Sequence, residues 1–216
     1  MAKKLLTTPR GVAVYPHLSK PDTKFNERGE YKIKWQGTGA EAEKLVKQID
    51  AAMKESAKAA SEAEAKDKKR KVKLASVPYT RNEDGSVTIS FKMVASGVSK
   101  KTGEAWTRRP VLFDTSGKPY TTVPRVGGGS TVKISFELNQ YARPSTEQKG
   151  VVLAGANLRL EAVQIIELVE FGGNAEYFGF QNEGEETEEG APTPAGAKAT
   201  EDEEEETPAS GSADEF

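Results

Sequence analysis

The sequence predicts a mainly β protein, a small closed barrel of five or six strands with one long inserted helix and an acidic C-terminal tail. Three observations support this. Short segments alternate apolar and polar residues between turn sequences. One long segment instead repeats its apolar residues with helical spacing. The C-terminal residues carry a large excess of acids. No regular strand–helix alternation indicates a parallel sheet, and a β-sandwich remains the alternative architecture.

The predicted strands share period-2 alternation and begin or end at turn residues. They cover residues 12–15, 31–35, 87–93, 106–113, 131–138 and 157–171. The first is expected to end at Pro16, because proline cannot donate to a sheet ladder. In the last, the phase of the apolar residues changes near Val163, which predicts a bulge or bend.

One long amphipathic helix is predicted for about residues 40–66. Its thin apolar stripe includes Leu45, Ile49 and Met53, and charged residues occupy most other positions. The helix ends in a basic run, where positive charge suits the helix dipole. The following segment, 66–78, has no assigned structure or role.

Charge divides the chain into two parts. Residues 181–216 contain thirteen Asp or Glu and one Lys, whereas the whole chain has a formal net charge of −2. Residues 1–180 therefore carry a net charge of about +10. We expect a folded basic domain at 1–180 and a disordered tail at 181–216, which is too poor in apolar residues to fold. The basic domain predicts a polyanionic partner, for which the tail would compete.

A five-stranded Greek-key barrel of this kind is an OB-fold, an architecture that binds oligonucleotides. Binding to single strands requires Lys and Arg along a groove and aromatic faces on which bases stack. Candidates that combine these features are Lys32, Lys34, Trp35, Tyr79, Lys92, Trp106, Arg108, Arg109, Lys133, Tyr141 and Arg143.

The alternation of inward and outward positions along a strand predicts which aromatic residues lie in the core and which can stack with bases. Tyr31 shares a strand face with Ile33, opposite the lysines, so a core position is favoured. Trp35, at the strand end, fits the core and a stacking role about equally. The aromatics that border turns are the better stacking candidates: Tyr79, Trp106 and Tyr141. Those expected in the core are Phe91, Phe113 and Phe136.

Other features argue against an enzyme. The chain has no Cys, so disulfides and thiolate metal sites are excluded, and His17 is its only histidine. Residues 127–130 lack the Lys-Ser/Thr ending of a phosphate-binding loop and are interpreted as a connection. The acidic residues Asp114, Glu137 and Glu161 show no paired spacing typical of a metal nuclease. We expect no cofactor, no signal peptide and no membrane span.

A set of short motifs, in this order and spacing, is similar to a known family. The motifs are Met1–Lys4, Lys20–Asp22, Glu27–Gly29 before Tyr31–Lys32, Phe91–Lys92, Ala95–Ser96, Lys100–Thr102, Val123–Pro124, Gly127–Ser130, Leu160–Glu161, Glu167–Leu168, Phe171–Gly173 and the acidic tail that ends in Phe216. Through most of its length the chain resembles the single-stranded DNA-binding proteins of short-tailed lytic phages that replicate with their own polymerase and helicase-primase.

The resemblance implies an OB-fold with an inserted helix and a homodimer in the absence of DNA. It also implies that the acidic tail occupies the DNA groove until DNA displaces it, and then contacts replication partners. The residues that match the family's DNA-binding positions are Lys3, Arg28, Lys92, Lys133 and Tyr141. The patch around Lys69 and Arg70 matches less well, because the family's proline-rich stretch is missing there.

The resulting hypothesis is a non-enzymatic protein of phage DNA replication, recombination and repair. It would coat unpaired DNA without base specificity in the cytoplasm of the infected bacterial host. Its tail would recruit the phage DNA polymerase and helicase-primase, through residues Glu201, Asp202, Glu203, Glu204, Glu205, Glu206, Asp214, Glu215 and Phe216. The alternatives are an RNA-binding OB-fold protein, an acidic-tailed chaperone of basic proteins and a metal-dependent nuclease.

Overall fold

Five strands close into a barrel in the computed structural model, which describes residues 5–66 and 70–170. In chain order they are β2 (Gly11–Asp22), β3 (Glu30–Gly37), β6 (Val87–Val94), β10 (Thr131–Pro144) and β11 (Val151–Glu167). β2, β3 and β6 form an antiparallel meander, β11 pairs in parallel with β6, and β10 pairs with both β11 and β2. The fourth strand thus returns beside the first, which is the Greek-key arrangement of the predicted OB-fold.

Period-2 alternation determines which side chains fill the barrel. On β3, Tyr31, Ile33 and Trp35 point inward and are buried, while the intervening lysines lie on the outer face. β6 contributes another buried row, in which the Phe91 ring lies 4.9 Å from that of Phe136 on β10, measured between centroids. Burial of these rows gives the barrel one continuous apolar core.

Within the described residues, six further short strands extend the barrel sheet or lie beside it. They are β1 (Leu5–Thr7) on β10, β4 (Lys71–Leu74) and β9 (Val111–Phe113) on β11, β5 (Tyr79–Arg81) on β6, and the separate hairpin of β7 (Ser96–Val98) and β8 (Ala105–Thr107). The prediction of one strand over 106–113 was wrong, because this segment contributes to two sheets. Arg108 N donates to Ala95 O and Pro110 has no N–H to donate, so the chain leaves one sheet before joining the other.

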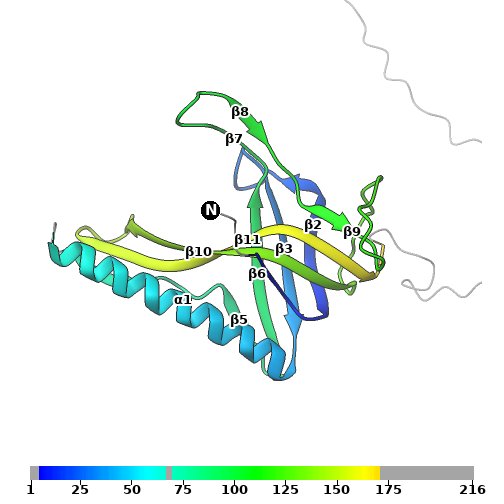
Figure 1. Cartoon of the computed structure of the whole chain (residues 1–216), viewed down its shortest axis with the longest axis horizontal. Helices are drawn as coiled ribbons and strands as arrows, with labels where there is room; N and C mark the ends of the chain where they lie inside the picture. The colour runs from blue at the N-terminus through cyan, green and yellow to red at the C-terminus, as the bar shows by residue number, and fades with distance from the viewer. Residues whose placement is uncertain (1–4, 67–69, 171–216) are drawn as a thin grey trace, which may run out of the picture.

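Helix α1 (Gly39–Lys66) agrees with the predicted helix to within a residue. At about 1.5 Å per residue its 28 residues span about 42 Å. Its buried stripe begins at Ala42 and continues to Ala60. Figure 1 shows the helix running beneath the outer ends of β10 and β11, which we call the arm. Ser56 Oγ donates to Tyr141 O at 2.8 Å, so the second half of the helix supports the arm.

Strand β2 does not end at Pro16 as predicted but continues to Asp22. Val14 pairs with Lys34 and His17 with Lys32, so Tyr15 and Pro16 together lie opposite the single residue Ile33. This is a β-bulge, where a missing N–H is tolerated. The proline interrupts one step of the ladder without ending the strand.

The predicted irregularity near Val163 is confirmed as a bulge in β11. Phe136 pairs with Leu160 whereas the preceding residue, Ser135, pairs with Ala162. One extra residue, Glu161, therefore sits in β11 and shifts the inward phase of the strand.

Some predictions fall on residues that the structure does not describe. These are Lys3, Lys69 in the basic run and the whole acidic tail, including Phe216. Among the described helices, none is long and apolar enough to cross a membrane.

Candidate nucleic-acid interface

Three lysines occupy one outer face of the barrel, and we call them the lysine face. Lys32 and Lys34 project from β3 and Lys92 from β6, because these positions alternate with the buried rows. Lys32 and Lys92 are direct cross-strand partners, and Lys34 follows two residues along β3. The Lys92 side chain is 64% exposed and that of Lys32 is 33% exposed, so both can be reached from solvent.

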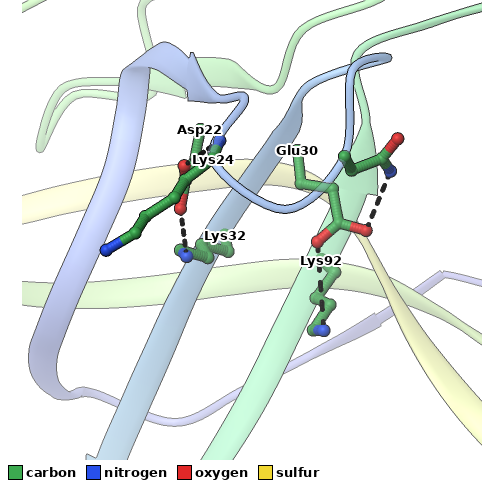
Figure 2. A network of polar contacts seen from close by, with 6 residues as sticks. Asp22, Lys24, Glu30, Lys32 and Lys92 are labelled. Atoms are coloured by element: carbon green, nitrogen blue, oxygen red, sulfur yellow. Dashed lines mark hydrogen bonds and ion pairs between the residues drawn. The ribbon is translucent and has the colours of Figure 1, made fainter.

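Two carboxylates lie beside these lysines, as Figure 2 shows. Asp22, at the end of β2, accepts a hydrogen bond from Lys32 Nζ at 2.5 Å. Glu30 Oε2 lies 3.9 Å from Lys92 Nζ. The hydrogen bond from Lys32 lowers the pKa of Asp22, so this carboxylate is ionised at neutral pH and competes with any other anion for the lysine.

A cleft of about 570 Å³ opens where β3 begins and β6 ends. Its lining includes Arg28, Arg108 and Arg109, with Glu27 as the one carboxylate among the lining residues. Ser96 Oγ donates to Arg28 O at 2.8 Å, which fixes the β2–β3 loop against the segment that follows β6. We call this site the arginine cleft. Its lining includes Tyr31, the residue before Lys32, so the cleft lies close to the lysine face along the chain.

Trp106 lies beside the arginine cleft but is half-buried. The Arg108 guanidinium carbon is 4.1 Å from the centroid of its ring, a cation–π contact. Across the β7–β8 hairpin its partner is Gly97, where an added Cβ would come within 2.5 Å of the indole. The ring therefore packs on the glycine backbone, and Arg108 occupies a position where a base would stack.

Trp35 lies in the core, as one of its two interpretations expected, and presents no exposed ring face for stacking. Its side chain is fully buried, and Nε1 donates to Pro9 O at 3.2 Å. A Cβ on Gly11 or Gly37 would lie within 2.2 Å of the indole, so two glycines make room for it. The position of Trp35 near the end of a strand could not predict that its side chain is enclosed, because the neighbouring glycines come from β2 and β3.

The side chain of Tyr79 also makes its contacts within the protein. Its hydroxyl donates to Asp50 Oδ1 of α1 at 2.9 Å, and its half-buried ring packs against the core. Burial, followed by the contact with Asp50, raises the pKa of Tyr79. The side chain therefore joins β5 to the helix and is not presented for stacking.

The remaining predicted residues lie in two further places. Tyr141 and Arg143 lie on the arm, with the guanidinium carbon 5.5 Å from the ring centroid. Lys133 lines a second cleft of about 660 Å³, between the chain near β1 and the first turns of α1. Arg10 and Lys44 also line it. The structure thus brings together six predicted cations, on the lysine face and in the arginine cleft, and separates Lys133, Tyr141 and Arg143 from them.

Two aromatic residues were missed by the sequence analysis. Among the described residues, Tyr15 and Phe25 are the exposed aromatic side chains, at 74% and 85%. The available signals were a proline directly after Tyr15 inside an apolar run, and the position of Phe25 between Lys24 and Asn26 in a polar loop. The expected core aromatics Tyr31, Phe91 and Phe136 are buried, whereas Phe113 is only half-buried.

Carboxylates elsewhere serve as ion-pair partners. Arg159 pairs with both Glu137 and Glu161 on the outer face of β10 and β11. Within residues 5–66 and 70–170, no group of three or more His, Asp or Glu side chains could hold a metal ion.

A closed five-stranded Greek-key barrel with a lysine face and an adjoining arginine cleft defines a nucleic-acid-binding protein of the OB-fold class. Comparison with known proteins identifies the family. Residues 10–168 match the family model described as single-stranded DNA-binding protein, bacteriophage T7. The chain belongs to this family, whose function is binding and not catalysis.

Individual relatives agree with this assignment. The single-stranded DNA-binding protein of Escherichia phage T7 is 34% identical over 80% of this chain and 80% of the relative. That of Enterobacteria phage T3 is 33% identical over 94% of this chain and 91% of the relative.

Solved structures show the same fold. The crystal structure of gp2.5, a single-stranded DNA-binding protein encoded by bacteriophage T7, matches with a TM-score of 0.68 and 30% identity, over 87% of this chain and all of that one. A truncated single-stranded DNA-binding protein of bacteriophage Enc34 matches with a TM-score of 0.51 at 14% identity, over 77% and 87% of the two chains. The second likeness concerns the fold alone.

Proposed function

We propose that this protein binds single-stranded DNA without base specificity, in the replication, recombination and repair of phage DNA. The observation that carries the proposal is that the Lys32–Lys92 pair lies close in the chain to the arginine cleft, whose lining includes Tyr31, the residue before Lys32. Lysine and arginine side chains in a row bind successive phosphates, which are the same in every sequence.

Binding would proceed by exchange of anions. Phosphates would replace Asp22 at Lys32 and Glu30 at Lys92, because both contacts are partly exposed and pairs of this kind contribute little in water. Bases would face the protein surface and stack there. Since only the unpaired strand fits, binding shifts the melting equilibrium of hairpins and duplexes by mass action.

The acidic tail is proposed as a competitor for the same surface. Its charge opposes that of the basic domain, so it can occupy the lysine face and arginine cleft until DNA displaces it. Released, it would bind the phage DNA polymerase and helicase-primase. Phe216 would fill an apolar pocket of the partner, while the acids, from Glu201 to Glu206 and at Asp214 and Glu215, would meet a basic rim. The protein would form a homodimer and act in the cytoplasm of the infected bacterial host.

A salt titration tests the proposed function. Binding of oligo-dT should weaken linearly on a log–log plot against salt, with a slope of about −0.7 for each phosphate contact. Duplex DNA and an RNA of matched sequence should be run in parallel. Binding that is insensitive to salt, or that prefers the duplex, would contradict the proposal. A preference for RNA would instead support the alternative of an RNA-binding OB-fold protein.

A further inference from the structure

The bulge in β2 brings Tyr15 to the surface. In unbroken alternation Tyr15 would share the inward direction of Ala13, which is fully buried. Because Tyr15 and Pro16 together oppose Ile33, the alternation is interrupted, and Leu18 resumes the inward row. The phenol ring is 74% exposed as a result. The irregularity thus removes a large aromatic side chain from the core and adds it to the outer surface.

Tyr15 is also held in an unusual backbone conformation. Its φ is 48°, and it is the one non-glycine residue with positive φ in the described part of the chain. A bulky side chain rarely adopts this left-handed region, where glycine or asparagine is tolerated better. A strained residue of this kind, retained on the surface, indicates a role other than stability.

A lysine lies close to each exposed ring. Lys34 Nζ of the lysine face is 5.8 Å from the centroid of Tyr15, and Lys24 Nζ is 5.4 Å from that of Phe25. A base that stacked on either ring would place its phosphate near an ammonium group. Both rings remain exposed beside a lysine, which is the composition that single-strand binding requires, whereas Trp106 is half-buried and packs on Gly97 as well as against Arg108.

The loop that carries Phe25 is held by its own hydrogen bonds. Lys24 N donates to Asp22 Oδ1 at 2.9 Å, and Arg28 N donates to Asn26 Oδ1 at 3.1 Å. Gly29 N donates to Asn26 O at 2.8 Å, which closes the turn. These contacts use backbone and polar groups, so the fold of the loop does not need the Phe25 ring. The ring is presented on a preorganised support.

We infer that Tyr15 and Phe25 are the base-stacking residues of this protein, one toward each end of the lysine face. Tyr15 lies beside Lys34, whereas Phe25 follows Asp22, which pairs with Glu30 at the start of β3. The strand between Lys34 and Glu30 is about 13 Å long, at about 3.3 Å per residue. A single strand that crosses the lysine face would meet both rings. The inference rests on the proposed function and specifies its stacking surface.

Two probes separate stacking from phosphate binding: oligo-dT and an abasic oligonucleotide of the same length. Tyr15→Asn and Phe25→Ala should each weaken oligo-dT binding about 5- to 150-fold, the equivalent of about 1–3 kcal/mol for one stacked base. Their affinity for the abasic strand and the salt slope on both probes should stay at wild-type values. Tyr15→Phe and Phe25→Tyr, which keep a ring, should bind oligo-dT as the wild type does.

Stability measurements exclude a merely structural effect. Asn tolerates the left-handed region, so Tyr15→Asn should keep or raise the Tm while it loses oligo-dT affinity. Val111→Ala, which trims another exposed apolar residue, is the matched control and should change neither property. Equal losses on both probes, or full oligo-dT affinity in Tyr15→Asn and Phe25→Ala, would overturn the inference. A wild type that binds neither probe would instead refute the proposed function and the inference with it.

Discussion

Lys32 and Lys92 lie directly opposite one another on neighbouring barrel strands. Like charges in this position repel, at a cost of some tenths of a kcal/mol to about 1 kcal/mol. Asp22 and Glu30 offset part of this repulsion from the strand ends. In the proposed function a bound phosphate would offset it as well, so the pair would contribute more to the bound state than to the free fold.

Lys32→Ala and Lys92→Ala should weaken oligo-dT binding and reduce the salt slope by about 0.7 each, because each removes one phosphate contact. Neither should change the free energy of unfolding by more than about 1 kcal/mol, because both ion pairs are partly exposed. Fluorescence anisotropy at several salt concentrations measures the first effect, and thermal melting the second. Lys118→Ala, an exposed lysine in the turn after β9, is the control. A slope unchanged by either variant would place the strand elsewhere.

Asp22→Asn should strengthen DNA binding. Asparagine keeps an oxygen that accepts the Lys24 N–H but loses the charge that competes for Lys32. Affinity at low salt should rise several-fold, with a slope steeper by up to about 0.7. Weaker binding by this variant would show that Asp22 positions Lys32 for DNA and does not compete with it.

The same residue predicts a pH dependence. Because the pKa of Asp22 is lowered in the fold, its ionised form adds stability above the unfolded pKa, and this is lost as pH falls through the folded pKa. Between about pH 8 and 9 the carboxylate stays ionised, so the ratio of the affinities of the wild type and of Asp22→Asn should be constant. Binding isotherms across this range test it. A ratio that drifts would mean that another group governs the competition.

Trp106 should report DNA binding by fluorescence. Oligo-dT is expected to quench tryptophan emission, and of the two tryptophans Trp35 is fully buried whereas Trp106 borders the arginine cleft. Trp106→Phe should abolish the quenching, whereas Trp35→Phe should retain it with a lower Tm, because it leaves a cavity between Gly11 and Gly37. Quenching that disappears only in Trp35→Phe would indicate that DNA acts through the barrel interior.

Removal of the tail tests the proposed competition. A chain without residues 181–216 should bind oligo-dT more tightly and lose its affinity for the phage polymerase, because it loses a net charge of about −12. Phe216→Ala should leave DNA affinity nearly constant and weaken polymerase binding. Weaker DNA binding by the truncated chain would exclude intramolecular competition.

Much of the barrel was predictable because alternation is a local property. The row of Tyr31, Lys32, Ile33 and Lys34 already separates an inner from an outer face, and the structure places it that way. The phase change near Val163 likewise indicated a bulge that the pairing confirms. The end of β2 was misjudged, since the effect of Pro16 depends on whether the partner strand leaves a position unpaired.

The candidate site was harder to predict than the barrel. Lysines on outward strand positions could be named from the sequence, but the approach of Arg28 to Arg108 and Arg109 depends on a loop and a hairpin that meet in space. The sequence was least informative about which aromatic side chains are exposed. Tyr79 and Trp35 satisfy their polar atoms with Asp50 and Pro9, which are far away in the sequence.

By itself the sequence determined the strand faces, the helix and the division into a basic domain and an acidic tail, because periodicity and charge are carried by neighbouring residues. The tertiary structure decided which cations share a surface and which rings remain exposed. Exposure is settled by what packs on a side chain: two glycines enclose Trp35, whereas a bulge turns Tyr15 outward. Such packing arises only when distant strands pair.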